Sequence, residues 1–258
     1  VTCQMLNGIY QNAATMSGLE TWNNAIAQNL AQSSIPGYKK ATLSFEGEAN
    51  GLIGYGGGTF DQTLFRETIA ATGKNGVDFS AGGVRTTNID TDFALEKPGF
   101  FELKTPEGQY VYTRDGQFQR NGEGELVSKQ GYHVMSDART IIQLDMGGGA
   151  LKGLADGSIS QGSRKIGMIG VRNVDDLSTL IRSHGGFVVD PEVVGDVKAV
   201  DPDQILVRHA ALESSNVTNT KEMVDMITVS RAFQLNQQVI RGRDDLLGKA
   251  IQTLGGRV

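Results

Sequence analysis

The chain contains one cysteine, Cys3, among 258 residues. A disulfide within the chain and a zinc site built from several thiolates are therefore excluded. We interpret Cys3 as a small side chain near a terminus, because a lipid-modified cysteine would be expected to follow a long apolar segment. No apolar run reaches about 18 residues, so we expect no membrane insertion. No basic segment followed by an apolar block resembles a cleavable signal, so an exported chain would need another route.

Positive charge is also in short supply. The chain has 24 Lys and Arg against 29 Asp and Glu, a net charge of -5 and a pI near 5.3. Proteins that bind nucleic acid nonspecifically have the opposite balance, and no basic stripe is present. A hydrophobic content of 39% excludes a disordered chain, and the length allows one or two domains.

Patterns typical of catalysis or ligand binding are missing. The three histidines, His133, His184 and His209, are far apart and form no metal-binding pair at i,i+4 spacing. Asp90 and Asp92 are spaced like the start of a calcium loop, but the other ligands do not follow. No phosphate loop or nucleophile elbow is present. We therefore expect no catalytic residue, no cofactor and no metal ion.

Glycine and proline are concentrated in the middle of the chain. Of 34 glycines, 27 lie between Ala41 and His209, and residues 1–35 and 203–258 contain no proline. Two segments that favour helix therefore flank a turn-rich centre.

The N-terminal segment has the heptad spacing of a helix seam. Its two tracks are Ile9, Met16, Asn23, Leu30 and Met5, Asn12, Leu19, Ile26. Glu20 is the only charged residue before Lys39, so asparagine and glutamine occupy the outer positions. Amides can hydrogen-bond across an interface without the desolvation cost of an ion. We expect the helix to end near Ser34, because Pro36 disfavours helix at the residue before it.

The C-terminal segment repeats this pattern. One track is wholly apolar, and the other is apolar at its ends. The tracks are Met226, Phe233, Ile240, Leu247, Leu254 and Met223, Ser230, Gln237, Asp244, Ile251. We predict a helix from about Val217 to about Leu254, with N-caps among residues 214–216 and a stop at Gly255.

These patterns predict an α+β fold in which the N- and C-terminal helices pair as a coiled coil around a central, mainly antiparallel β domain. The alternative is that each helix packs on a core of its own chain. The predicted division is 1–37 plus 212–258 as a helical assembly domain, 38–80 as a connector and 81–211 as a β-rich outer domain. The residues predicted to form the subunit interface are Ile9, Met16, Leu19, Ile26, Leu30, Met223, Met226, Phe233, Ile240, Leu247 and Leu254.

The centre has short β-branched and aromatic runs separated by turn signals. Strands are predicted within residues 100–104, 110–113, 117–119, 126–127, 132–134, 165–171 and 186–189. Turns are predicted at residues 106–108, at Asp115-Gly116 and at Asn121-Gly122. Residues 41–80 have the weakest pattern, with Gly56-Gly57-Gly58 in a flexible or tightly turned connector.

Three groups of residues, in order along the chain, resemble the flagellar rod and hook protein family. They are residues 24–31 (NAIAQNLA) with 35–39 (IPGYK); residues 99–101 (GFF), 112–118 (YTRDGQF), 124–127 (GELV) and 131–132 (GY); and residues 212–217 (LESSNV), 222–227 (EMVDMI) and 231–233 (RAF). The first group departs from the family pattern at Gln28, Gln32 and Ile35, where Asn, Asn and Thr are usual.

The resemblance implies a structural subunit of the basal-body rod, the axial drive shaft that transmits torque to the hook, and no enzyme. It implies self-assembly, contacts with other axial proteins and with the flagellar export apparatus, and a periplasmic location reached without a cleaved signal peptide. The proximal rod protein is slightly preferred. The alternatives are the distal rod protein, or a hook-type or adhesin-like fibre module. An enzyme with a β-rich core is a further rival, but no motif supplies its site.

Overall fold

The computed structural model describes residues 2–50, 68–145, 147–189, 197–201 and 204–255. These residues form two compact units. Unit 1 contains residues 1–31, 41–78 and 218–258, and unit 2 contains residues 32–40 and 79–217. The triple glycine at residues 56–58 lies outside the described residues. The predicted α+β class is confirmed, while the coiled-coil pairing stays a prediction.

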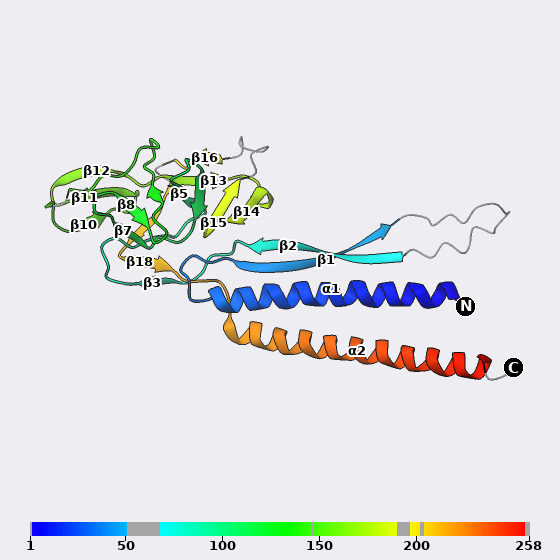
Figure 1. Ribbon diagram of the computed structural model, residues 1–258. Helices are drawn as coiled ribbons and strands as arrows, with labels where there is room; N and C mark the ends of the chain where they lie inside the picture. The colour runs from blue at the N-terminus through cyan, green and yellow to red at the C-terminus, as the bar shows by residue number, and fades with distance from the viewer. Residues whose placement is uncertain (1, 51–67, 146, 190–196, 202–203, 256–258) are drawn as a thin grey trace, which may run out of the picture. The chain divides into compact units, whose positions relative to one another are not determined.

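Unit 1 is built from the two long terminal helices and a two-stranded ribbon. Helix α1 is Thr2–Gln32 and helix α2 is Asn219–Gly255, so both predicted helices exist. They run in opposite directions, with both chain ends at the same end of the unit (Figure 1). No helix in the described residues is sufficiently long and apolar to span a bilayer.

The ribbon lies in the segment with the weakest sequence pattern. Strands β1 (Lys40–Asn50) and β2 (Thr68–Asp78) pair with each other and with no third strand among the described residues. Figure 1 draws their arrows in opposite directions. A two-stranded ribbon buries little apolar surface of its own, which explains why alternation of apolar residues did not reveal it.

The predicted N-caps of the C-terminal helix are wrong. Helix α2 begins at Asn219, too far downstream for residues 214–216 to cap it. Ser215 Oγ instead accepts a hydrogen bond from Val217 N at 3.1 Å, and Asn216 Oδ1 accepts one from Lys40 N at 2.7 Å. These side chains therefore shape the approach to the helix.

Unit 2 is centred on a nine-stranded sheet with antiparallel pairing. Its path runs β14-β15-β6-β5-β9-β8-β7, and β13 pairs with both β5 and β16. The strands are β5 (Phe100–Lys104), β6 (Tyr110–Thr113), β7 (Phe118–Arg120), β8 (Leu126–Ser128), β9 (His133–Val134), β13 (Val171–Val174), β14 (Leu180–Ser183), β15 (Gly186–Val189) and β16 (Val197–Ala199).

Three smaller sheets complete unit 2. One has the order β10-β11-β12, and the others are the pairs β17-β4 and β18-β3. Their strands are β3 (Val84–Thr86), β4 (Phe93–Leu95), β10 (Leu151–Gly153), β11 (Ser158–Gln161), β12 (Arg164–Met168), β17 (Val207–His209) and β18 (Ala211–Glu213). A short 3-10 helix covers Leu177–Thr179.

One hydrophobic core joins the nine-stranded sheet, the β10-β11-β12 sheet and the β17-β4 pair. It contains Phe93, Phe101, Leu126 and Ile159, each with none of its surface exposed. The Phe101 and Phe118 rings meet edge to face at 5.3 Å between centroids, a favoured aromatic geometry. Burial of this cluster supplies the main driving force for folding unit 2.

Two predicted β-hairpin turns are confirmed. Residues 106–108 connect the paired strands β5 and β6, and Asn121-Gly122 connects β7 and β8. Asn121 Oδ1 accepts hydrogen bonds from Glu123 N at 3.0 Å and Glu125 N at 2.8 Å. The side chain thus holds the turn closed, as asparagine often does.

The turn at Asp115-Gly116 has a different role from the one predicted. It separates β6 from β7, which do not pair. Gly116 instead packs against strand β4, where a Cβ on it would lie 1.7 Å from Phe93 O. The glycine is therefore required by a close approach of two backbones.

The single strand predicted over residues 165–171 is also wrong. The segment divides into β12 and β13 at Ile169-Gly170. Gly170 N donates to Met135 O at 2.8 Å, and a Cβ on Gly170 would lie 2.8 Å from Ser136 O. The chain changes sheets at this glycine because the Met135–Ser136 backbone approaches it closely.

Candidate subunit interface and junction cluster

The first candidate surface is the seam of α2. Met226, Phe233, Ile240 and Leu247 are each half-buried, and Val229, on the same face, is only 2% exposed. Spacings of three and four residues place them on one stripe of a helix. The side chains of the wholly apolar track are therefore partly covered within the single chain.

The seam of α1 is arranged similarly. Ile26 is 2% exposed, and Met16, Leu19 and Leu30 are half-buried. The side chains of Ile9 on α1 and Leu254 on α2 lie outside those the structure describes. Whether any of these residues meets a neighbouring subunit stays a prediction.

The second track of α2 has a different environment. Met223 is 57% exposed and Ser230 is also exposed, whereas Glu222 and Val229, one position earlier, are buried. A seam can alternate three then four residues or four then three. The periodicity alone was therefore compatible with two companion tracks, one through Met223 and Ser230 and one through Glu222 and Val229. In the single chain the second track is buried.

Several large apolar side chains of α2 face solvent in the single chain. We call them the outer stripe. Its members, with their exposed fractions, are Val224 (56%), Ile227 (53%), Leu235 (61%), Val239 (51%) and Leu246 (68%). Exposed apolar side chains gathered along one helix are typical of a surface that another protein covers.

A buried amide connects the two helices within unit 1. Asn29 Nδ2 on α1 donates to Glu222 Oε2 on α2 at 3.1 Å and to Ala41 O at 2.9 Å. Asn29 Oδ1 accepts from Ala41 N at 2.8 Å. Asn29 and Glu222 are each 1% exposed. The side chain therefore joins α1, α2 and the start of the ribbon at one point.

Unit 2 contains a group of three buried charged residues that we call the junction cluster: Lys39, Arg114 and Glu213. Lys39 Nζ lies 2.7 Å from Glu213 Oε1, and Arg114 Nη1 lies 3.2 Å from Glu213 Oε2. Gly82 N donates to Glu213 Oε1 at 2.9 Å. One buried carboxylate thus receives hydrogen bonds from a lysine, an arginine and the backbone, as a buried charge requires.

The lysine and the arginine of the junction cluster also donate hydrogen bonds to backbone oxygens. Lys39 Nζ donates to Ser80 O at 2.7 Å, and Arg114 Nη1 donates to Leu95 O at 3.3 Å. Burial lowers the pKa of Arg114, and the neighbouring Glu213 carboxylate opposes that shift. The cluster holds residues 37–40, which follow the end of α1, against residues 213–216, which precede α2.

A glycine allows the chain to reach this cluster. Gly37 has φ of +66°, and a Cβ on it would lie 2.3 Å from Arg114 C. Gly37 N donates to Glu213 O at 2.7 Å. Arg182 lies over the neighbouring Tyr38 ring at 4.4 Å and donates to Lys39 O at 2.5 Å. Only glycine combines this φ with such close packing.

A second buried carboxylate stabilises the sheet. Glu102, with no exposed surface, accepts from Arg172 Nε at 2.9 Å and from Arg139 Nε at 3.1 Å. Burial raises the pKa of the adjacent Tyr112, and the Glu102 charge adds to this shift. The carboxylate is fully engaged by two arginines, which is typical of a structural ion pair. In the described residues no group of His, Cys, Asp and Glu side chains could hold a metal ion.

The sequence analysis did not select Lys39, Arg114 or Glu213 as functional. A signal was present, because Lys39 is the first charged residue after Glu20 and lies beside a proline-glycine turn. Residues 35–39, 112–118 and 212–217 also carry the family resemblance. The structure brings these three distant segments together, which periodicity within any one of them does not reveal.

Comparison with known proteins gives the same family from the centre and from the C-terminal part of the chain. Residues 208–253 match the model of the flagellar basal body rod FlgEFG protein C-terminal region, and residues 94–161 match that of the flagellar hook protein FlgE/F/G D1 domain. The first match contains most of α2, and the second contains the sheet strands β5 to β9.

Relatives align over nearly the full length. Flagellar basal-body rod protein FlgF of Rhizobium meliloti is 31% identical over 98% of this chain and 99% of its own length. FlgF of Mesorhizobium japonicum is 30% identical over 98% and 100%. Flagellar basal-body rod protein FlgG of Buchnera aphidicola is 29% identical over 89% and 92%. This chain therefore belongs to the flagellar basal-body rod protein family.

Proposed function

We propose that this chain polymerises into the axial rod of the flagellum, with α1 and α2 paired as a coiled coil and with their outer faces against neighbouring subunits. Family membership makes the chain a structural subunit of the basal-body rod rather than an enzyme. The rod would act as the drive shaft that transmits torque to the hook.

The outer stripe of α2 is the observation that carries this proposal. Each of its five residues is more than half exposed in the single chain. Burying a fully exposed side chain of this type contributes roughly 1.5–3 kcal/mol, and covering the exposed half of each of these would contribute roughly half of that. A neighbour that covers several of them therefore gains substantial free energy. A contact between different surfaces of like subunits does not close on itself and therefore extends into a filament.

The composition of α1 supports the same proposal. Its exposed positions include Asn23, Asn24 and Gln28, and Glu20 is its only charged residue. Uncharged polar side chains can be covered by another subunit without leaving a buried ion. The buried Asn29–Glu222 hydrogen bond would fix the relative position of the two helices near one end of the pair.

The finer placement is also a proposal. We place the subunit in the periplasmic part of the basal body, exported by the flagellar apparatus without a cleaved signal peptide. Its partners would be copies of itself and other axial proteins. We prefer the proximal rod position slightly. The distal position stays the alternative, because relatives named FlgF and relatives named FlgG have similar sequence identity to this chain.

Electron microscopy of basal bodies from cells that lack the protein tests this function. Rods that stop short and carry no hook would support it, and the break point would separate the proximal from the distal position. Complete hooks and filaments would contradict a rod role and favour a separate fibre module.

A substitution tests the helix seam directly. Phe233→Asp places a charge in the half-buried track of α2, so we expect the variant to be excluded from the rod while the β-rich unit stays folded. Phe233→Leu, which keeps an apolar side chain at the same position, is the matched control and should assemble. Normal incorporation of Phe233→Asp, measured in purified basal bodies, would contradict the seam.

A further inference from the structure

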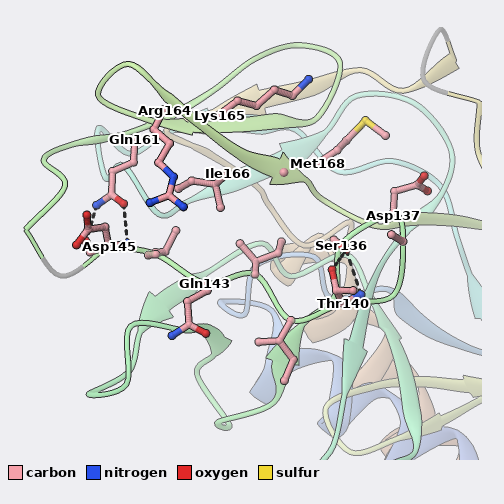
Figure 2. A pocket seen from close by; sticks show the side chains of 15 residues that line it. Ser136, Asp137, Thr140, Gln143, Asp145, Gln161, Arg164, Lys165, Ile166 and Met168 are labelled. Atoms are coloured by element: carbon pink, nitrogen blue, oxygen red, sulfur yellow. Dashed lines mark hydrogen bonds between the residues drawn. The ribbon is translucent and has the colours of Figure 1, made fainter.

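A groove lies in unit 2 between strand β12 and the segment of residues 140–145, and we call it the β12 groove (Figure 2). It encloses a cavity of about 800 Å³. Ile141, Leu144, Ile166 and Met168 give it apolar walls. This volume falls in the range of known ligand sites, and nothing in the proposed rod function uses it.

Both walls of the groove offer free strand edges. Strand β12 is the last strand of its sheet, so one row of its backbone groups faces away from β11. On the opposite wall, Ile142 O accepts from Leu126 N at 3.0 Å, and Leu144 N donates to Gly124 O at 2.6 Å. Alternation along a strand therefore points the backbone groups of Gln143 the other way, away from β8.

The groove is held open by hydrogen bonds at both ends. At one end Gln161 Oε1 accepts from Asp145 N, and Gln161 Nε2 donates to Asp145 O, each at 2.8 Å. At the other end the Ser136 and Thr140 hydroxyl groups lie 2.7 Å apart, and Asp137 N donates to Met168 O at 3.1 Å. A site formed in advance loses little entropy when a ligand enters.

Two carboxylates and two cations line the groove, and both carboxylates are engaged by other groups. Asp137 Oδ1 lies 3.3 Å from Arg172 Nη1, and Asp145 Oδ1 accepts from Gly147 N at 3.2 Å. Arg164 points into the space beside Ile166, whereas the next side chain, Lys165, points away (Figure 2). Within the described part of the chain, the Arg164 guanidinium forms no ion pair. Guanidinium groups bind carboxylates with two parallel hydrogen bonds.

We propose that the β12 groove binds an extended acidic peptide segment of another protein. The segment adds a strand to one or both free edges, which gives affinity through backbone hydrogen bonds. An apolar side chain of the segment rests on Ile141, Leu144 and Ile166. A carboxylate side chain two residues away, and therefore on the same face of the added strand, meets Arg164. The charge complementarity selects acidic over neutral segments, and this inference does not depend on the rod function.

The test uses the full chain, isotopically labelled, and two blocked peptides that differ in one group. The probe is acetyl-VTETV-amide, whose valines share one face of the strand with the glutamate, and its neutral counterpart is acetyl-VTQTV-amide. NMR titration should show saturable shifts at the backbone amides of Gln143 and Lys165, which face away from β8 and β11, with at least fivefold tighter binding of the acidic peptide. Arg164→Gln should remove that preference, and Lys165→Gln, the matched control, should keep it.

Three results would overturn the inference. They are shifts that map outside the groove, equal affinity for the two peptides, or the same loss in Lys165→Gln as in Arg164→Gln. The last would show a general attraction between opposite charges. Both arginine and lysine are exposed, so unchanged thermal melting of the two variants would confirm that folding is preserved.

Discussion

The junction cluster predicts a large stability loss from a change that removes one charge and no volume. In Glu213→Gln, Lys39 and Arg114 would remain buried with no carboxylate between them. Removing one partner of a buried ion pair costs about 3–5 kcal/mol, because the uncompensated charge stays in a medium of low polarity. The amide oxygen of glutamine can still accept from Gly82 N, so the loss measures mainly the charge.

An exposed pair supplies the matched control. Glu96 and Arg208 are also 2.7 Å apart, but their side chains are 28% and 52% exposed. Exposed pairs contribute about 0–1 kcal/mol, so Glu96→Gln should change the free energy of unfolding little. The two variants have the same chemistry and differ in burial.

Urea unfolding followed by circular dichroism distinguishes them. With slopes of about 1–3 kcal/mol per molar urea, Glu213→Gln should lower the midpoint by at least about 1 M. Lys39→Met should lose a similar amount, and the double variant should lose less than the sum, because both changes break the same pair. A Glu213→Gln midpoint equal to that of Glu96→Gln would refute the role assigned to the cluster.

Three further perturbations follow from the structure. Burial raises the pKa of Asp115 to about 6, so the folded protein is more stable when this carboxyl group is protonated, and that stability is lost as pH rises from about 4 to 6. Asp115→Asn should make the free energy of unfolding independent of pH over this window and should add up to about 3 kcal/mol at pH 7. Urea unfolding at several pH values measures both effects. Gly37→Ala should cost more than the 1–2 kcal/mol of a left-handed residue because its Cβ also meets Arg114, whereas Gly83→Ala, with open space around it, should be tolerated in thermal melts. Asn29→Ala leaves Glu222 Oε2 without this hydrogen bond and should increase amide hydrogen exchange near the start of α2; unchanged exchange would argue against the link.

Local sequence patterns were sufficient for both helices and for strands β5 to β9 and β15, whereas most of the other short strands were not predicted. Pro36 and Gly37 marked the end of α1, and proline-free heptads located α2, because helix formation depends on neighbours three and four residues apart. Asn121-Gly122 located a hairpin for a similar reason, since the asparagine side chain closes its own turn.

Patterns within one segment could not settle choices that depend on distant backbone. Asp115-Gly116 has the residues of a hairpin turn, but its glycine serves an approach to Phe93. The ribbon of β1 and β2 was missed because strands without a core to cover carry little alternation. The choice between Met223 and Glu222 for the covered face of α2 likewise required the partner, Asn29.

The sequence by itself determined the two terminal helices, the β-rich centre and, through three groups of motif residues, the family. These depend on local periodicity, turn chemistry and residue identity. Only the tertiary structure decided that Lys39, Arg114 and Glu213 share one buried cluster, and that Arg164 enters a groove while Lys165 leaves it. The reason is physical: a buried charge is stabilised by groups that the fold brings close in space, however far apart they lie along the chain.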